Sequence, residues 1–355
     1  ERGAFEGKTE PNLAELLDLV ALRTVADVLK LDQNNRILVS QGLQRMRADR
    51  MQPGIRALFA AAGRDASRAT TFDMGFALGP RLNAAGRLAD MSLGIECLIT
   101  DDIGRALNIA QELDKLNRER RAIEADMQEG AMAELDGIDP GTRSTLTLFE
   151  AEWHQGVIGI LAGRIKEKFH RPTIAFARGN DGELKGSGRS IPGLHLRDAL
   201  DLVTKRAPGL ILKFGGHAMA AGLTINEVDL ARFEQIFETV VHSLIDPADL
   251  TRSLETDGAL EDSLYSLETA RLLEREIWGQ GFAAPVFDDT FRVENQRILK
   301  DKHLKLQLKK GATRIDAIQF NHADPAGQTI HAAFRLAVNE YNGVSSIQLM
   351  LEHFE

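Results

Sequence analysis

Several features that would define a protein class are missing from this sequence. Its 355 residues contain one cysteine, Cys97, so a disulfide framework is excluded and a reducing compartment is expected. There is no apolar run of about 18 residues and no signal peptide. The first residues also include no initiator methionine. We therefore expect a cytoplasmic chain without membrane contact, which opens within a domain.

Positive charge is scarce as well. Lysine and arginine number 43 against 52 aspartate and glutamate residues, which gives a formal net charge of −9. This balance argues against indiscriminate binding of polyanions but leaves room for a local basic groove. Basic residues gather between residues 164 and 213, where either a groove or an ordinary set of solvated charges fits the pattern.

Complete catalytic motifs are absent too. The sequence contains no HExxH, no CxxC and no Walker motif, and no Ser-His-Asp order indicates a nucleophilic triad. A two-metal site needs several carboxylates or histidines, and the motifs described below offer a single candidate acid. The residues themselves predict a polyanion-binding protein with an incomplete catalytic centre.

Helical periodicity dominates the first part of what is present. Apolar spacing predicts helices over 12–29, 36–49 and 53–62, the first with Asn12 as its N-cap. A longer helix is predicted from about residue 103 to 135. It would be about 50 Å long, and a rod of that length more often joins two domains than packs within one.

The ends of this long helix are also predicted. Thr100 or Asp101 is the expected N-cap, and Gly137 with Pro140 is the expected end. Strands and helices then alternate, which predicts an α/β domain. The strands are expected at 144–150, 173–178, 183–190 and 218–225, and the helices at 156–169, 195–206 and 229–245.

The last hundred residues have the alternation and turn signals of short strands. These are expected at 286–298, 302–309, 313–320, 328–337 and 344–353. Five short strands favour a small β-barrel, for which an oligonucleotide-binding (OB) fold is one candidate.

Two candidate sites lie before the long helix. Asp27, in "TVADV", follows apolar residues and is either a metal ligand or a surface carboxylate at a helix end. The segment "GPRLNAAGR" places Arg81, Asn83 and Arg87 among small residues. Arginines with an amide suit a phosphate, although exposed arginines at a helix start would give the same pattern.

Three further candidates lie in the α/β domain. In "WHQGVIGILAGRI", His154 and Gln155 precede a helix whose free amides favour an anion. The loop or strand "LKGSGRS" offers Ser187, Arg189 and Ser190 as phosphate donors, or it is a flexible turn. In "KFGGHAMAAGLTI" the glycines indicate either a bulge or the close approach of a ligand.

Together these segments resemble the RecJ family of bacterial single-strand-specific 5′→3′ exodeoxyribonucleases, within the DHH phosphoesterase superfamily. The resemblance extends from about Pro11 to the end and rests on five blocks in the family's order. These blocks begin with "LAELLDLVALRTVADVLKLDQNNRILVSQGL", "GFALGPRLNAAGRL" and "EWHQGVIGILAGRIKEKFHRPTIAFA", and end with "LKGSGRSIPGLHLRDAL" and "KFGGHAMAAGL".

The resemblance implies a fold class of α/β plus all-β. Its four parts would be the C-terminal, helical remainder of a DHH catalytic domain, a connecting helix, a DNA-binding α/β DHH-associated domain, and an OB-like β-barrel. In that order their expected ranges are 1–100, 101–137, 138–246 and 250–355. The Asp-His-His motif itself is absent from this sequence.

The resemblance also implies roles for individual residues. Mn²⁺ or Mg²⁺ would be the cofactor, and Asp27, the carboxylate of the family's last catalytic motif, would be the only metal ligand present. Arg23 and Lys30 depart from the Gly and Pro that the family usually has at these positions. The DNA and its 5′ phosphate would be held by two sets of residues. One is Ser187 and Arg189 with Arg81, Asn83 and Arg87, and the other is Gly215, Gly216 and His217.

The implied function is metal-dependent exonuclease action on single-stranded DNA in repair and recombination. A single-strand-binding protein and a helicase are implied as partners of a monomeric enzyme. This chain alone is expected to bind single-stranded DNA without cleaving it. Two alternatives stay open, namely a DHH-type phosphodiesterase acting on short oligonucleotides or cyclic dinucleotides, and a non-catalytic binding scaffold.

Overall fold

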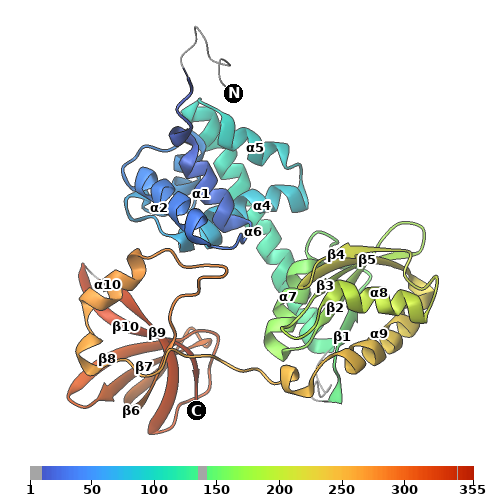
Figure 1. Cartoon of the computed structure of the whole chain (residues 1–355). Coiled ribbons are helices and arrows are strands. Elements are labelled where there is room, and N and C mark those ends of the chain that lie inside the picture. The colour runs from blue at the N-terminus through green and yellow to red at the C-terminus, as the bar shows by residue number, and fades with distance from the viewer. Residues whose placement is uncertain (1–9, 135–141, 342) are drawn as a thin grey trace. The chain divides into compact units, whose positions relative to one another are not determined.

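A computed structural model describes residues 10–134, 142–341 and 343–355 (Figure 1). The chain forms two compact units. The first unit comprises Glu1–Arg81, Ile95–Gln111 and Leu254–Glu355, and the second unit comprises Leu82–Gly94 and Glu112–Ser253. Among the described residues, none of the helices combines the length and the apolar composition that a membrane crossing requires.

The N-terminal part of the first unit is helical. Its elements are the 3-10 helix η1 (Leu13–Leu16), α1 (Leu17–Ala26), α2 (Gln33–Arg47), α3 (Pro53–Ala61) and the π-helix η3 (Asp73–Leu78). The predicted helices at 36–49 and 53–62 are confirmed, as is the N-cap Asn12, whose side chain accepts a hydrogen bond from Ala14 N. Helices α4 (Gly79–Leu88) and α5 (Ser92–Ile99) follow.

The prediction of one helix over 12–29 is wrong at its C-terminal end. Helix α1 stops at Ala26 because the chain turns there. Val28 N donates to Val25 O and Leu29 N donates to Thr24 O, which is the hydrogen-bond pattern of a Schellman motif. Val28 takes the left-handed conformation, with φ of 56°, at the position where glycine is usual.

The predicted long helix is confirmed as α6 (Ile103–Glu134). Its N-cap is neither Thr100 nor Asp101. Asp102 Oδ1 accepts from Arg105 N at 3.0 Å, while Thr100 Oγ1 only accepts from Asp102 N. The predicted helix end at Gly137 and Pro140 lies outside the described residues.

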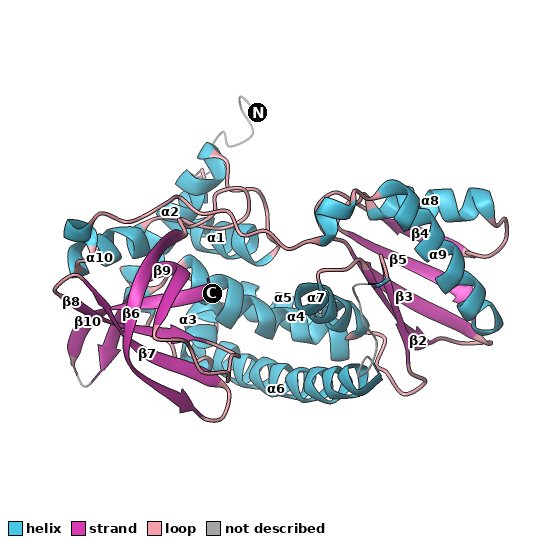
Figure 2. Ribbon diagram, turned by 90° about the horizontal axis from the view of Figure 1, so that it is seen from below, coloured by secondary structure: helices cyan, strands magenta, loops and turns pink. Residues whose placement is uncertain are grey.

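The second unit contains a five-stranded sheet in the order β1-β2-β3-β5-β4. Figure 2 shows β2, β3, β5 and β4 side by side in this sheet. Strand β1 pairs with β2 in parallel, and the other pairs are antiparallel. The strands are β1 (Leu146–Phe149), β2 (Thr173–Arg178), β3 (Glu183–Arg189), β4 (Lys213–Gly216) and β5 (Ala220–Asn226). All but β4 were predicted.

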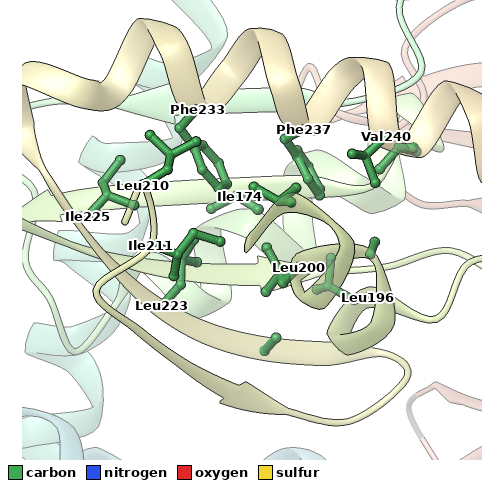
Figure 3. Close-up of a cluster of buried hydrophobic side chains, with 14 of the residues drawn as sticks. Ile174, Leu196, Leu200, Leu210, Ile211, Leu223, Ile225, Phe233, Phe237 and Val240 are labelled. Carbon is green, nitrogen blue, oxygen red and sulfur yellow. The ribbon is translucent and has the colours of Figure 1, made fainter. Parts of the chain in front are cut away.

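Helices cover both faces of this sheet. Helices α8 (Leu196–Arg206) and α9 (Leu230–Leu244) lie on one face, where Phe233 and Phe237 of α9 pack toward Ile174 and Leu200 (Figure 3). Helix α7 (Ile158–Phe169) packs with α6 residues against β1 and β2 on the other face. These helices match the predicted segments.

The C-terminal part of the first unit is a closed barrel in the order β10-β8-β7-β6-β9. The five predicted strands are confirmed as β6 (Phe287–Leu299), β7 (His303–Lys310), β8 (Thr313–Gln319), β9 (Thr329–Tyr341) and β10 (Val344–Phe354). Helix α10 (Leu267–Arg275) was not predicted. A closed five-stranded barrel is consistent with an OB fold.

Candidate functional site

Strand β3 carries the most distinctive polar group of the second unit. Burial alternates along β3, so Ser187 and Arg189 share one face of the sheet. Arg189 Nη1 donates to Ser187 Oγ at 3.2 Å and to Gly188 O at 2.8 Å. Within the described residues, no carboxylate forms an ion pair with this guanidinium. A cation of this kind can bind an anion from outside.

The electrostatic surroundings of Arg189 support this interpretation. Burial lowers the pKa of the Arg189 guanidinium, and the nearby positive charge of Arg87 lowers it further. The two causes are distinct, since burial keeps water from the charged form and the like charge of Arg87 repels it. A bound phosphate would remove both penalties.

The N-terminus of α7 lies next to the side chains of Ser187 and Arg189. Its N-cap, Val157, provides no side-chain hydrogen bond, and the backbone satisfies the first amides instead: Ile158 N donates to His154 O at 3.2 Å and Ile160 N to Val157 O at 2.8 Å. What the helix start offers an anion is its positive dipole end. A Cβ at Gly159 would lie 2.8 Å from Ser187 Oγ and 2.9 Å from Arg189 Nη2. Glycine therefore keeps the helix start, the hydroxyl and the guanidinium together, in an arrangement suited to an anion.

Arg87 is held beside this group by the loop before α7. Its Nη1 donates to Gly156 O at 2.8 Å, and a Cβ at Gly156 would lie 2.5 Å from Arg87 O. His154 Nδ1 accepts from Gly156 N at 3.1 Å. A neutral His154 ring then carries its proton on Nε2, which leaves that atom as an exposed donor.

The sheet continues from Ser187 into an open glycine surface. In cross-strand register, Ser187 pairs with Gly222, and Gly222 pairs with Gly215. A Cβ at Gly215 would meet nothing within 4 Å, and one at Gly222 would meet only Gly186 O at 3.8 Å. Internal packing therefore requires neither glycine. Their absent side chains leave exposed backbone next to the Ser187–Arg189 group.

Gly216 has a different reason to be glycine. Its φ is +152°, and a Cβ there would lie 2.4 Å from Ala220 O. His217 N donates to Ala220 O at 2.8 Å and closes the turn between β4 and β5, with the His217 side chain exposed. Gly216 thus serves the turn, whereas His217 is available to a ligand.

The other residues predicted to bind phosphate do not all lie beside Arg189. Asn83 and Arg87 are four residues apart on α4 and share a face, whereas Arg81 is turned about 160° from Asn83 and about 120° from Arg87, and it donates to Ala77 O. Gln155 Nε2 donates to Arg178 O. Ser190 is buried and its Oγ donates to Leu194 O at 2.8 Å, so Ser190 is left out of the candidate site.

Two residues of the site were not among the predicted ligands. Gly159 and Gly222 contribute space and backbone rather than a side-chain donor. Their position among the glycines of "GVIGILAG" and "AMAAGL" was the only signal in the sequence.

Asp27, in the first unit, does not form a metal site with the described residues. Its Oδ2 lies 2.6 Å from Arg23 Nε, and 45% of the Asp27 side chain is exposed. In the described part of the chain, no three His, Cys, Asp or Glu residues are grouped so that they could hold a metal ion. These residues alone therefore do not fit a Mn²⁺ or Mg²⁺ centre, and we derive no reaction step through a metal.

Comparison with family models identifies two domains. The DHHA1 domain matches residues 142–243, and the RecJ OB domain matches residues 256–353. The first agrees with the sheet and helices of the second unit, and the second agrees with the barrel. The predicted fold class is confirmed, while the predicted domain boundaries stay predictions.

Curated relatives named single-stranded-DNA-specific exonuclease RecJ align with nearly the whole chain. The Dickeya dadantii protein is 51% identical, over 99% of this chain and 63% of its own length. The Escherichia coli protein is 48% identical, over 97% of this chain and 61% of its own length. The chain thus spans less than two thirds of these relatives.

Solved structures agree with this assignment. A crystal structure of RecJ in complex with Mg²⁺ from Thermus thermophilus aligns with a TM-score of 0.83 at 30% identity, covering 98% of this chain and 53% of that one. A Mn²⁺ complex from the same organism gives 0.83 at 29% identity, covering 99% and 50%. The resemblance predicted from the motifs is thereby confirmed: this chain matches the C-terminal part of members of the RecJ family.

Proposed function

We propose that the group around Arg189 binds the 5′-terminal phosphate of single-stranded DNA, as part of a 5′→3′ exonuclease activity of the whole protein. The observation that carries this proposal is the half-buried Arg189, which has Ser187, Arg87 and a helix N-terminus beside it and no carboxylate partner in the described structure. Guanidinium groups and helix amides both favour phosphate oxygens.

Each residue has a defined part in holding the end of the strand. Arg189 and Ser187 donate to the terminal phosphate, and the dipole at the N-terminus of α7 favours the negative charge. Arg87 supplies a second positive charge, with His154 Nε2 and His217 as further donors. The open backbone of Gly215 and Gly222 gives the following nucleotide room to approach the sheet. Anchoring the end in this way fixes which phosphodiester is next in line for hydrolysis.

Two features make this function more specific than anion binding. The barrel after residue 256 matches an OB domain, a fold that binds single strands through stacking and charge. The presence of this OB domain favours a function on long single strands, and it argues against the short oligonucleotides or cyclic dinucleotides that other DHH-type phosphodiesterases cleave. The relatives that align with the whole chain are named as single-stranded-DNA-specific exonucleases.

The proposal includes expectations that rest on family resemblance. Mn²⁺ or Mg²⁺ would be the cofactor of the whole protein, with Asp27 as one ligand. The protein would act in DNA repair and recombination, as a cytoplasmic monomer, with a single-strand-binding protein and a helicase as partners. Because the described residues hold no metal cluster, we expect this chain by itself to bind single-stranded DNA without cleaving it.

Binding of 5′-phosphorylated and 5′-hydroxyl single-stranded oligonucleotides to this chain tests the proposal. We expect tighter binding of the phosphorylated strand. Arg189→Ala should remove this preference and weaken phosphorylated-strand binding by about 10- to 100-fold, because one charge-assisted hydrogen-bond donor is lost. Fluorescence anisotropy at fixed ionic strength measures both affinities.

Arg178→Ala provides a matched control, because Arg178 lies on the neighbouring strand and pairs with Glu227 at 2.7 Å. That variant should retain the preference for the phosphorylated end. Thermal unfolding should show Arg189→Ala to be as stable as the parent, since no ion pair is broken. Equal affinity of the parent chain for both oligonucleotides would overturn the proposal.

A further inference from the structure

Two ring side chains lie side by side on the surface of the C-terminal barrel. The ring centroids of His303, at the start of β7, and Phe320, directly after β8, are 5.1 Å apart, with the ring planes at 76°. Asn321 N donates to His303 Nδ1 at 3.0 Å, which holds the imidazole in place. Half of Phe320 is nevertheless exposed. A phenyl ring held in this way presents a flat apolar surface to solvent.

The pairing of the strands places polar side chains on the outer face of the barrel next to these rings. Burial alternates along β7, so Lys305 and Gln307 share that face with His303, while the leucines between them enter the core. Across the ladder, Arg297 of β6 lies opposite Lys305, and Asn295 lies opposite Gln307. Residues two apart on a strand are separated by about 7 Å. A cationic row and then an amide row therefore follow the rings at steps of about 7 Å.

Some of these polar side chains have no partner within the described part of the chain. Lys305 Nζ pairs with Asp316 of β8 at 3.0 Å. In contrast, the Arg297 guanidinium and the side-chain amides of Asn295 and Gln307 form neither an ion pair nor a hydrogen bond with any described residue. All five side chains line a hollow of about 220 Å³ on the barrel surface. The unpaired donors and acceptors in this hollow are therefore available to a ligand.

The turn between β6 and β7 adds charge at the end of this face that carries the rings. Lys300 and Lys302 are exposed there and form no ion pair among the described residues, while Asp301 between them offsets one charge. Phosphates attract cations, and bases stack on flat apolar rings. Bases also carry hydrogen-bonding edges, for which amide side chains are suited. A single strand of nucleic acid therefore matches all three kinds of group on this face.

We propose that this outer face of β6, β7 and β8 contacts the bases of single-stranded DNA. One base stacks on Phe320, and the amides of Asn295 and Gln307 hydrogen-bond to the edge of a neighbouring base. Arg297 and Lys305, in the row between them, hold the phosphate that joins the two nucleotides. These contacts make binding depend on the bases themselves, which phosphate contacts alone do not. The inference goes beyond the proposed function, because the site lies in the first unit and needs no 5′ phosphate.

Strands with and without bases test this inference. The probe is a 5′-hydroxyl single strand of about 16 nucleotides, either complete or with abasic nucleotides through its middle. The whole chain is used with Arg189→Ala as the background, so that the group around Arg189 contributes little to either titration. We expect the complete strand to bind about fivefold more tightly or better, because the abasic strand has no base to stack on the ring. Fluorescence anisotropy at fixed ionic strength measures both affinities.

Substitutions of the ring separate stacking from charge. Phe320→Ala should weaken binding of the complete strand by about fivefold or more and leave binding of the abasic strand unchanged. Phe320→Trp retains a stacking ring and should bind as the background chain does. Tyr341→Ala is the matched control, because Tyr341 is another exposed ring of the barrel, at the end of β9. It should leave both affinities unchanged, and thermal unfolding checks that each variant is folded.

The amide row has its own test. The double variant Asn295→Leu with Gln307→Met keeps the sizes of the side chains and removes both amides. It should weaken binding of the complete strand by about threefold to tenfold, because base edges lose their partners, and spare the abasic strand.

Several outcomes would overturn this inference. Equal affinity for complete and abasic strands would do so, as would a loss in Phe320→Ala that is the same for both strands, since the face would then bind only the backbone. A loss in Tyr341→Ala as large as that in Phe320→Ala would show that any exposed ring of the barrel suffices. No change in Phe320→Ala is the result expected if the face binds a partner protein instead. All these titrations use 5′-hydroxyl strands, so failure of the proposed function would appear only in the comparison of phosphorylated and hydroxyl ends.

Discussion

Arg189 in the second unit and Asp27 in the first have opposite electrostatic surroundings. Arg189 is half buried, and its recorded partners are the neutral Ser187 hydroxyl and the Gly188 carbonyl. Asp27 is exposed over 45% of its side chain, and its charge is matched by Arg23 at 2.6 Å. A ligand would add to the stability of the first group, whereas it would have to displace Arg23 to bind the second.

The backbone conformation also differs between these two regions: it is regular around Arg189 and strained next to Asp27. Around Arg189 the chain is regular, with β3 in register and α7 starting at Ile158. Next to Asp27 the chain is strained, because Val28 has a φ of 56° and β-branched residues rarely adopt it. In the Arg189 region, unstrained elements hold one cation without a carboxylate partner among the described residues, an arrangement suited to an anion. The Asp27 segment, by contrast, would need further carboxylate or histidine ligands to bind a metal ion.

Filling the anion site should give the largest effect. In Gly159→Ala the new methyl group would lie 2.8 Å from Ser187 Oγ and 2.9 Å from Arg189 Nη2. We expect binding of 5′-phosphorylated single strands to fall by about tenfold or more, because the guanidinium must move away from the helix start. Titration with the phosphorylated oligonucleotide measures this loss.

Gly163→Ala is the matched control for this prediction. Gly163 lies one helical turn later on α7, and a Cβ there would meet nothing within 4 Å. This variant should bind as the parent does and be more stable by about 0.5 to 1 kcal/mol, the usual gain for alanine over glycine within a helix. If Gly159→Ala and Gly163→Ala bind the phosphorylated strand equally well, the close approach of Gly159 to Ser187 and Arg189 has no role in binding.

Much of the Arg189 region could be predicted because strand periodicity is local. A period of two groups Ser187 with Arg189. The same period turns Ser190 away from them, and so argues against our prediction of Ser190 as a phosphate donor. The structure agrees, since Ser190 is buried and bonded to Leu194 O. The same period predicted the barrel strands. Strand β4 was missed because "KFGG" replaces the alternation of side chains with two glycines.

Contacts between distant segments could not be predicted from one sequence. Arg87 and Gly156 are separated by 69 residues, and nothing in the spacing of either motif pairs them. Arg120 and Glu124 have the (i, i+4) spacing of an ordinary exposed pair, and their burial depends on the packing of α7 against α6. In the Asp27 region, helix periodicity continued past Ala26, but the Schellman hydrogen bonds ended the helix there.

Relief of the strain beside Asp27 should give an intermediate effect. Val28→Gly places glycine at the left-handed position of the Schellman motif, where it is favoured. Because 63% of Val28 is exposed, little packing is lost. We expect the free energy of unfolding to rise by about 1 kcal/mol in denaturant titrations, without any change in binding of the 5′ phosphate. Lower stability would show that the Val28 side chain contributes more than its exposure implies.

The smallest change in stability is expected when the Arg23–Asp27 ion pair is broken. Arg23→Ala removes the partner of Asp27, but both side chains are exposed and four residues apart on one helix turn. Such pairs contribute about 0.3 to 0.5 kcal/mol, and salt screens them. Denaturant titrations at low and high salt should therefore show a small destabilisation that disappears at high salt, with 5′-phosphate binding unchanged. A loss of more than about 1 kcal/mol would mean that the Asp27 segment depends on Arg23 for its conformation, and the contrast with Arg189 would then be smaller than these contacts indicate.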